Sequence, residues 1–239
     1  MKNIIFNVCL LFVNISLFAQ EKSPLHIQHL TDNFYVYTTY KDFNGTEFPS
    51  NSMYLVTQNG VVLFDTPWDD TQFQPLLDSI YSKHNKKVVL AIATHYHDDR
   101  TAGLEFLRQN RIKTYSSQLT YDLCEKHNEK QAAFSFVNDT TFNVGNYKFE
   151  TYYAGEGHTK DNIVIWFDDY QILYGGCLVK STQVENLGNV TDANLEEWPL
   201  SIEKIMKKYP NRKFVIPGHF GWSNNKGLEY TLKLLMQNN

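Results

Sequence analysis

The stretch Val88-Val-Leu-Ala-Ile-Ala-Thr-His-Tyr-His-Asp-Asp-Arg100 passes from a continuous apolar run into a cluster of ionisable side chains. The apolar run from Val88 to Ala93 predicts a strand that is buried on both faces of a sheet. Loops held by a rigid scaffold concentrate function, and such loops begin where strands end. His95, His97 and Asp99 therefore lie where side chains can converge on a ligand.

Patterns typical of strands and helices alternate on both sides of this stretch. Strands are predicted at Phe34 to Tyr40, Ser52 to Gln58, Val61 to Phe64, Tyr147 to Tyr153, Asn162 to Phe167, Gln171 to Tyr174 and Phe214 to Ile216. Helices are predicted at Thr71 to Asn85, Ala102 to Gln109, Leu119 to Lys126, Trp198 to Tyr209 and Leu228 to Met236. Because helices fall between strands in both halves, the pattern predicts an α/β protein with two packed sheets and helices outside them.

The first residues differ from the rest of the chain. Lys2 precedes an apolar run that ends at Phe18-Ala19, and a polar sequence begins at Gln20. A charged start, a short apolar middle and a small final residue predict a secretory signal peptide over residues 1–19. The alternative is an anchor that stays attached, although the run is short for a membrane span. No linker or repeat divides residues 20–239, so we expect one domain that is exported to the periplasm and leaves the membrane after signal cleavage.

Composition and charge exclude some classes of partner. Of the 239 residues, 42% are hydrophobic, and 15 Tyr and 16 Phe supply bulk for a sizeable core. The net charge of −4 comes without a basic stripe or a polybasic segment. This pattern argues against binding to nucleic acid or to an anionic membrane surface.

Histidine, cysteine and aspartate gather at the ends of several predicted strands. His158 follows Gly155-Glu-Gly157, Cys177 follows Gly175-Gly176, and His219 follows Pro217-Gly218. Imidazole, thiolate and carboxylate are the usual ligands of zinc. With His95, His97 and Asp99 they number more than one tetrahedral ion can use, which predicts two adjacent zinc ions with open positions for water.

The remaining histidines and cysteine have a plainer interpretation. His26, His29, His84 and His127 stand in polar surroundings and are expected to be surface residues. Cys124 lies in a predicted helix, where a lone cysteine is usually a small buried hydrophobe rather than half of a disulfide.

Five longer motifs carry a resemblance to a known family. They are Thr94-His-Tyr-His-Asp-Asp-Arg-Thr101, Gly155-Glu-Gly-His-Thr-Lys-Asp-Asn162, Leu173-Tyr-Gly-Gly-Cys-Leu-Val-Lys180, Leu187-Gly-Asn-Val-Thr-Asp-Ala-Asn194 and Ile216-Pro-Gly-His219. In this order they resemble the class B metallo-β-lactamases of the first subclass, whose second zinc site contains a cysteine, and in particular the flavobacterial-type enzymes. The resemblance implies a four-layer αβ/βα sandwich.

The resemblance also implies the ligand sets and the chemistry. His95, His97 and His158 would hold the first zinc ion, and Asp99, Cys177 and His219 the second. In this family a hydroxide that bridges the ions attacks the lactam carbonyl of penicillins, cephalosporins or carbapenems. We therefore expect a zinc-dependent hydrolase that confers antibiotic resistance, with small-molecule substrates and a monomeric state.

Further site residues follow from the same resemblance. Lys180 would pair with the carboxylate of the substrate, although without this context it would be a surface lysine. Asp99 and Asn189 would be catalytic, with Asn189 also donating to the lactam carbonyl. Arg100 and Asp65 would orient the metal ligands, or could equally be ordinary buried ion-pair partners.

The segment from Tyr40 to Pro49 is longer than a tight hairpin needs and is expected to be a mobile loop with a turn at Asn44-Gly45. In this family the corresponding loop closes over the antibiotic. Phe43, Phe48 and Trp68 would then line the substrate.

Two residues depart from the commonest pattern of the family. Tyr96 is bulky between two ligands, and Phe220 stands where a glycine is often found. Both could reshape the pocket, so the preference among β-lactam classes stays open.

Two rival functions remain. A glyoxalase II-like thioesterase of the same superfamily would usually carry a histidine where this chain has Arg100, with no need of Cys177. A non-catalytic periplasmic zinc-binding protein would have no need of Lys180 or Asn189.

Overall fold

The computed structural model describes residues 25–237 of the chain. The signal peptide predicted at residues 1–19 lies outside these described residues. Within 25–237 there is no helix with the length and apolar character needed to cross a membrane.

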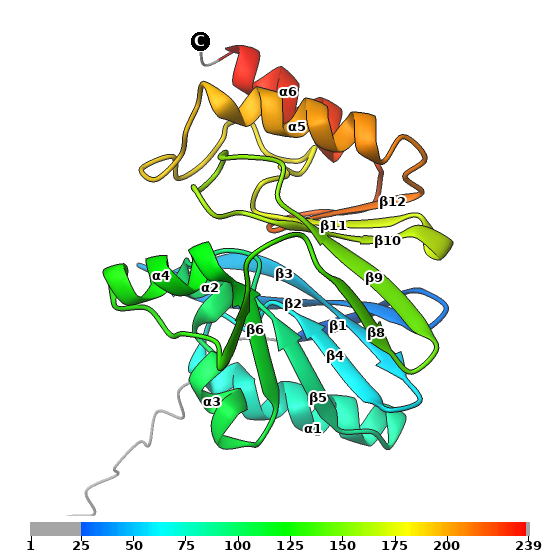
Figure 1. Cartoon of the computed structure of the whole chain (residues 1–239). Helices are drawn as coiled ribbons and strands as arrows, with labels where there is room; N and C mark the ends of the chain where they lie inside the picture. Colours follow the sequence, from blue (N-terminus) through cyan, green and yellow to red (C-terminus); the bar gives the residue numbers. More distant parts are fainter. Residues whose placement is uncertain (1–24, 238–239) are drawn as a thin grey trace, which may run out of the picture.

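Two β-sheets form the middle of the molecule (Figure 1). The first has seven strands in sequence order: β1 (His26–Thr31), β2 (Phe34–Phe43), β3 (Thr46–Thr57), β4 (Gly60–Phe64), β5 (Val88–Ile92), β6 (Lys113–Ser117) and β7 (Phe134–Phe136). The second has five strands in the order β12 (Phe214–Pro217), β11 (Ile172–Gly176), β10 (Val164–Phe167), β9 (Tyr147–Tyr152) and β8 (Thr141–Val144).

Helices cover the outer faces of both sheets, which makes four layers (Figure 1). The described helices are α1 (Phe73–His84), α2 (Asp98–Thr101), α3 (Leu104–Gln109), α4 (Gln118–His127), α5 (Glu197–Lys208) and α6 (Gly227–Gln237), with short 3-10 turns at Asp70–Gln72 and Asp168–Tyr170. Helices α1 and α3 lie on the side of the first sheet, and α5 and α6 on the side of the second (Figure 1). The expected αβ/βα sandwich is confirmed.

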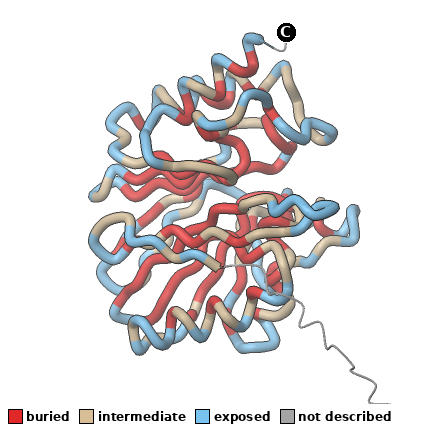
Figure 2. Tube along the Cα trace, turned by 180° about the vertical axis from the view of Figure 1, so that it is seen from behind, coloured by how far each residue is buried: buried red, intermediate tan, exposed pale blue. Residues whose placement is uncertain are grey.

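Aromatic side chains fill the space between the sheets. The Phe64 ring lies 5.2 Å from the rings of both Phe149 and Phe167, edge-on in each case. Figure 2 shows that the buried residues lie mainly in the strands, while the exposed residues lie on the outer helices and the turns. Burial of one such side chain contributes about 1.5–3 kcal/mol to the free energy of folding. This aromatic layer therefore holds the two sheets together.

Separate apolar clusters attach the outer helices. Leu76 and Ile80 of α1 pack with residues of β4 and β5 such as Leu63 and Ala91. On the other side α5 and α6 cover the second sheet through a cluster that includes Trp198, Ile202, Ile205 and Leu235. The helical spacing of these residues is the feature that predicted the helices.

The expectation that the segment from Tyr40 to Pro49 is a loop longer than a tight hairpin needs is wrong, although the predicted turn at Asn44-Gly45 is confirmed. The strands β2 and β3 continue through this segment and pair as far as Phe43 with Thr46. Only Asn44 and Gly45 lie outside the ladder, both with positive φ, at 55° and 84°. Asparagine and glycine tolerate that conformation, which lets a two-residue turn close a long hairpin without splaying its strands.

Candidate metal centre

The predicted ligands come from loops of both sheets. His95 and His97 follow β5, Cys177 and His219 follow β11 and β12, and His158 lies between β9 and β10. Asp99 lies in the first turn of α2, two residues after His97. The structure brings all of them to one edge of the sandwich.

Asp99, Cys177 and His219 form one compact group, whose ligand atoms lie within 4.8 Å of one another. Cys177 Sγ is 3.2 Å from both Asp99 Oδ2 and His219 Nε2, and Asp99 Oδ2 is 3.1 Å from His219 Nε2. Three atoms of thiol, carboxylate and imidazole that converge in this way can share one cation.

The imidazoles of His95, His97 and His158 meet in pairs beside this group. Their ring centroids are 4.8 Å apart for His95 and His97, and 5.1 Å for each of the other two pairs. Burial lowers the pKa of His95 and of His158 well below the usual value, so both rings keep a neutral nitrogen. Asp99 connects the two groups, because its Oδ1 lies 3.7 Å from His95 Nε2.

Unpartnered buried nitrogen atoms test whether a metal fits here. His95 Nε2 and His158 Nδ1 are buried and lack a hydrogen-bond partner. A buried polar atom without a partner costs about 1–3 kcal/mol, unless a further group satisfies it. The donor set of imidazole, carboxylate and thiolate suits zinc, so the residues fit the ion that the sequence predicted.

Hydrogen bonds to the opposite ring nitrogens orient two of the imidazoles. His219 Nδ1 donates to the carbonyl oxygen of Pro49 at 2.7 Å, which leaves Nε2 as the atom that faces Cys177 and Asp99. His97 Nε2 lies 3.1 Å from Asp192 Oδ2, which leaves Nδ1 for the centre. Such contacts fix the tautomer of a ligating histidine.

Arg100 lies fully buried beneath the second group. Its Nη2 is 3.0 Å from Cys177 Sγ, 3.0 Å from Asp99 Oδ2 and 2.8 Å from the carbonyl oxygen of Gly218. Its Nη1 donates to the carbonyl oxygen of Asn51 at 2.6 Å. A guanidinium is a donor only, so Arg100 braces the group and cannot itself bind a cation.

The Arg100 charge acts on the acidic members of the group. Although burial opposes it, the guanidinium holds the pKa of Asp99 well below its usual range. Burial raises the pKa of the Cys177 thiol, and Arg100 opposes this rise. Arg100 thus favours the anionic form of both side chains.

Asp65 supports the centre from below. Its Oδ1 accepts from the Thr94 backbone N–H at 2.7 Å, and its Oδ2 accepts from the Tyr174 hydroxyl at 2.6 Å. Arg100 Nη1 is 3.5 Å from the same Oδ2. Burial raises the pKa of Asp65 to about 6, against the opposing effect of Arg100 and these donors. Asp65 thus ties the strand end before His95 to the Arg100 brace.

A cavity of about 610 Å³ opens above the two groups, and its wall includes Lys180, Asn189, Phe48 and Trp68. Lys180 Nζ lies 5.2 Å from the centre of the Trp198 ring, which positions the ammonium group by a cation–π contact. Asn189 is exposed, and its Oδ1 accepts from the backbone N–H of Thr191 at 3.1 Å.

Phe48 of the β2–β3 hairpin forms an aromatic wall of the cavity together with Trp68 and Phe220. Phe48 lies 5.3 Å from the His219 ring and 5.0 Å from Phe220. Trp68 lies 5.9 Å from the His219 ring. Phe43 does not line this cavity; it is 48% exposed and packs against the two aromatic residues that do, 5.2 Å from Trp68 and 6.3 Å from Phe48.

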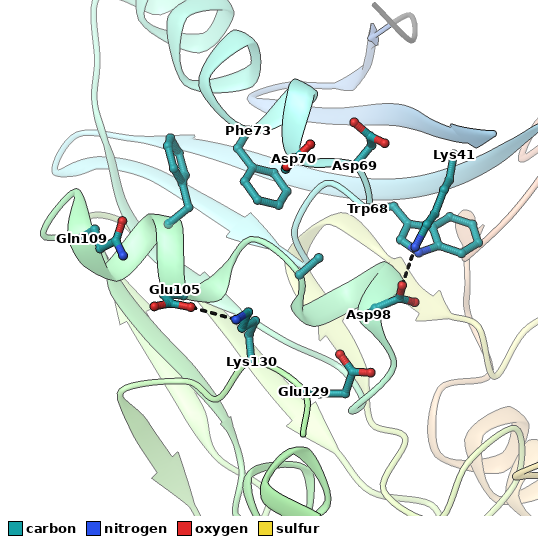
Figure 3. Close-up of a pocket in the computed structure, with 12 residues that line it drawn as sticks. Lys41, Trp68, Asp69, Asp70, Phe73, Asp98, Glu105, Gln109, Glu129 and Lys130 are labelled. Atoms are coloured by element: carbon teal, nitrogen blue, oxygen red, sulfur yellow. Dashed lines mark hydrogen bonds and ion pairs between the residues drawn. The ribbon is translucent and has the colours of Figure 1, made fainter. Parts of the chain in front are cut away.

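A second cavity of about 600 Å³ lies on the other side of Trp68 (Figure 3). Lys41 crosses its edge, with Nζ 2.6 Å from Asp98 Oδ2 and 5.1 Å from the centre of the Trp68 ring. Lys130 and Glu105 form a separate ion pair of 3.0 Å in the same cavity.

The residues outside the centre lie close to where they were expected. His26, His29 and His127 are exposed, while His84 is partly buried because its ring packs 4.8 Å from Tyr35. Cys124 is buried, and neither Cys124 nor Cys177 is in a disulfide. The Tyr96 ring packs between two imidazoles, 4.5 Å from the ring of the candidate ligand His97 and 4.7 Å from the ring of His127.

Sequence reasoning missed several residues that hold the ligands in place. Pro49 supplies only a backbone carbonyl, and Asn51 acts from a strand distant in sequence. Asp192 lies in the same motif as Asn189, the stretch Leu187 to Asn194. Its carboxylate is the one feature in the sequence that could have indicated a partner for a ligating histidine.

The fold and the converging ligands define the class of a metal-dependent hydrolase with an αβ/βα sandwich. The profile of the Metallo-beta-lactamase superfamily matches residues 45–219. The chain therefore belongs to the metallo-β-lactamase superfamily, and the resemblance seen in its motifs is confirmed.

Curated relatives and solved structures agree with this assignment. The chain is 42% identical to "Metallo-beta-lactamase type 2" of Elizabethkingia meningoseptica, over 93% of this chain and 90% of that protein. It is also 42% identical to metallo-beta-lactamase IND-1 of Chryseobacterium indologenes, over 91% of each chain. The crystal structure of metallo-beta-lactamase IND-7 matches with a TM-score of 0.86 and 41% identity, covering 89% of this chain and 98% of that one. A metallo-beta-lactamase from Pontibacter korlensis also matches with a TM-score of 0.86, at 36% identity, covering 90% of this chain and all of that one (100%).

Proposed function

We propose that this enzyme hydrolyses the ring amide of β-lactam antibiotics with two zinc ions and so confers resistance to them. One observation carries the proposal. Two groups of candidate ligands, joined by Asp99, converge on the floor of a cavity whose wall includes Lys180. In a metal-dependent amide hydrolase for an anionic substrate, the metal centre activates water and a nearby cation holds the carboxylate of the substrate.

His95, His97 and His158, whose rings meet in pairs, would hold the first ion. Asp99, Cys177 and His219 would hold the second. When bound, zinc supplies a water whose pKa falls to roughly 7 and a Lewis acid for the carbonyl oxygen. Asp99 directs one carboxylate oxygen toward each group, from where it can accept a hydrogen bond from the attacking water.

The cavity walls would orient the substrate. Lys180 attracts the carboxylate beside the lactam ring, while Trp198 holds the ammonium group in place. The Asn189 amide group can donate to the lactam carbonyl. Phe48 and Trp68 offer apolar surface to the rest of the molecule and exclude water from it.

The rival thioesterase is disfavoured by the Arg100 position. There the side chain is buried and donates to Cys177, so the second ligand group depends on the thiol rather than on a further histidine. The curated relatives, named as metallo-β-lactamases over 90% or more of this chain, point in the same direction. A zinc-binding protein without catalysis would not need a lysine such as Lys180 in the wall of the cavity.

We also propose that the enzyme acts in the periplasm as a monomer, takes carbapenems among its substrates and binds neither nucleic acid nor membrane once mature. The charged and then apolar sequence of residues 1–19 supports export. The similarity to curated metallo-β-lactamases supports β-lactams as the substrate class.

The test is a turnover assay of residues 20–239 with a penicillin, a cephalosporin and a carbapenem. We expect hydrolysis that EDTA abolishes and added zinc restores, together with two equivalents of zinc by elemental analysis. Full zinc occupancy without turnover of any β-lactam would reject the enzyme and leave the zinc-binding protein.

A further inference from the structure

Phe220 has an unusual backbone conformation for its residue type. Its φ is 61°, in the left-handed region, directly after the candidate ligand His219. A bulky side chain in this region is strained, and the conformation persists only where the surroundings impose it. Such strain often marks a functional position, so the contacts of Phe220 indicate what its conformation is for.

Hydrogen bonds from neighbouring segments impose the conformation. Asn51 Nδ2 donates to the carbonyl oxygen of Phe220 at 2.6 Å and to that of Pro217 at 3.1 Å. On the other side the Ser181 hydroxyl donates to the carbonyl oxygen of Gly221 at 2.6 Å. The loop after His219 is therefore held from both sides, and the Phe220 ring has a fixed direction.

That direction leads to the β2–β3 hairpin. The Phe220 ring lies 5.0 Å from Phe48, at an interplanar angle of 80°. This edge-to-face geometry is favourable for an aromatic pair. A glycine at this position would relieve the strain but would leave Phe48 without this contact.

A second contact holds the same face of the hairpin, through Lys41, the cross-strand partner of Phe48. Lys41 of β2 forms the 2.6 Å ion pair with Asp98, the residue before Asp99, and its Nζ lies over the Trp68 ring (Figure 3). This pair is partly exposed, with side-chain exposures of 33% and 41%, so it is weaker than a buried one. The hairpin is thus attached to two of the segments that carry candidate ligands, the one after β5 and the one after β12.

We propose that Phe220 is a positioning residue that holds the β2–β3 hairpin over the cavity before substrate arrives, with Lys41 as a weaker second contact. The inference rests on the proposed function only for its effect on substrate binding. The strain at Phe220 is retained because its ring places Phe48 above His219. A hairpin already in place avoids the entropy of ordering it on binding, and this lowers KM.

The test replaces Phe220 with glycine in the zinc-loaded enzyme. Hydrogen exchange without substrate should become faster at residues 41–50, because the aromatic contact is lost. An aromatic pair of this kind shifts an equilibrium roughly two- to tenfold, so KM for a β-lactam should rise by a similar factor with kcat little changed. Phe220→Tyr keeps the ring and should restore the original exchange and KM.

Arg111→Gly is the matched control. Arg111 also has a left-handed φ, of 60°, but it is exposed and follows α3. The variant relieves the same kind of strain and should leave hairpin exchange and KM unchanged.

Lys41→Met tests the second contact against Lys130→Met, which breaks the other ion pair of the neighbouring cavity. We expect faster exchange at the hairpin in the first variant, by less than in Phe220→Gly, and no change in the second.

Unchanged hairpin exchange in Phe220→Gly would overturn the proposal, and so would faster exchange with an unchanged KM. The exchange measurement needs no substrate. A wild-type enzyme that hydrolyses no β-lactam would therefore reject the proposed function without deciding whether Phe220 holds the hairpin.

Discussion

Arg100 Nη2 lies 3.0 Å from Cys177 Sγ and also 3.0 Å from Asp99 Oδ2. One buried nitrogen thus serves two of the three members of the second ligand group. The guanidinium offsets their negative charge in the interior, where an uncompensated charge is costly. Arg100 therefore allows the Cys177 sulfur and the Asp99 carboxylate to lie side by side in the interior, in addition to holding the loop in place.

Replacing Arg100 with Ala should be strongly destabilising. Breaking a buried ion pair costs about 3–5 kcal/mol, because the remaining charge is left unpaired. Guanidinium unfolding of the zinc-free protein measures this loss. The exposed Arg108 provides the control, since Arg108→Ala should change stability by less than about 0.5 kcal/mol. Equal stability of both variants would show that the Arg100 contacts contribute little.

Cys177→Ser should weaken the second zinc site and leave the first. A neutral hydroxyl is a poorer ligand than thiolate, while the three histidines of the other group are unaffected. Zinc titration should show one site of nearly unchanged affinity and one that is much weaker. In the cobalt-substituted enzyme the thiolate-to-metal charge-transfer absorption should disappear. Equal loss of both ions would contradict the assignment of ligands to two sites.

Much of the fold follows from local pattern, and the exceptions have physical causes. The apolar run from Val88 predicts β5 because it is buried on both faces. The polar segment of β6, Lys113–Ser117, has no such run, yet it pairs with β5 and β7 on either side. There the partners impose the strand, since strand propensity depends on context.

The candidate site, like the fold, could be predicted from the sequence only in part. Its ligand types and their places at strand ends are visible in the sequence, because each motif is local. The contacts that orient them are not. Pro49 reaches His219 only because the β2–β3 hairpin extends farther than expected, and Asn51 reaches the same loop through the pairing of β3. These contacts join residues that are 170 and 166 positions apart in the chain, so no sequence motif contains them.

Lys180→Ala should raise KM more than it lowers kcat. The lost interaction is with the substrate carboxylate, which stays charged throughout the reaction, so ground state and transition state lose similar binding. A loss of about 1.5–3 kcal/mol for a charged hydrogen bond corresponds to roughly ten- to hundredfold in kcat/KM. Steady-state kinetics with a carbapenem measures both constants.

Lys208→Ala is the control for the Lys180 variant. Lys208 also lies over an aromatic ring, 5.1 Å from the centre of Tyr209, and it lines neither the metal groups nor their cavity. This variant loses a comparable cation–π contact and should keep both constants. If Lys180→Ala behaves in the same way, Lys180 has no part in substrate binding.

Gly218→Ala should disrupt the second metal site through its backbone. A Cβ at this position would lie 2.6 Å from Cys177 Sγ, 2.7 Å from Cys177 N and 2.8 Å from Arg100 Nη2. The backbone cannot move away freely, because the Gly218 N–H donates to the carbonyl oxygen of Gly176 at 2.7 Å. Overpacking of this kind costs about 1–3 kcal/mol, and here the displaced atom is a candidate ligand.

Zinc analysis and thermal unfolding together separate a local effect from a global one. Gly145→Ala is the comparison variant, since Gly145 has a φ of 61° in the turn between β8 and β9 and an added Cβ there would meet Gln58 and Thr57 rather than a candidate ligand. Both variants should be less stable, but only Gly218→Ala should lose the second zinc ion at low zinc concentration. Retention of two zinc ions in Gly218→Ala would mean that Cys177 can shift and still bind, and the close packing at Gly218 would then serve stability alone.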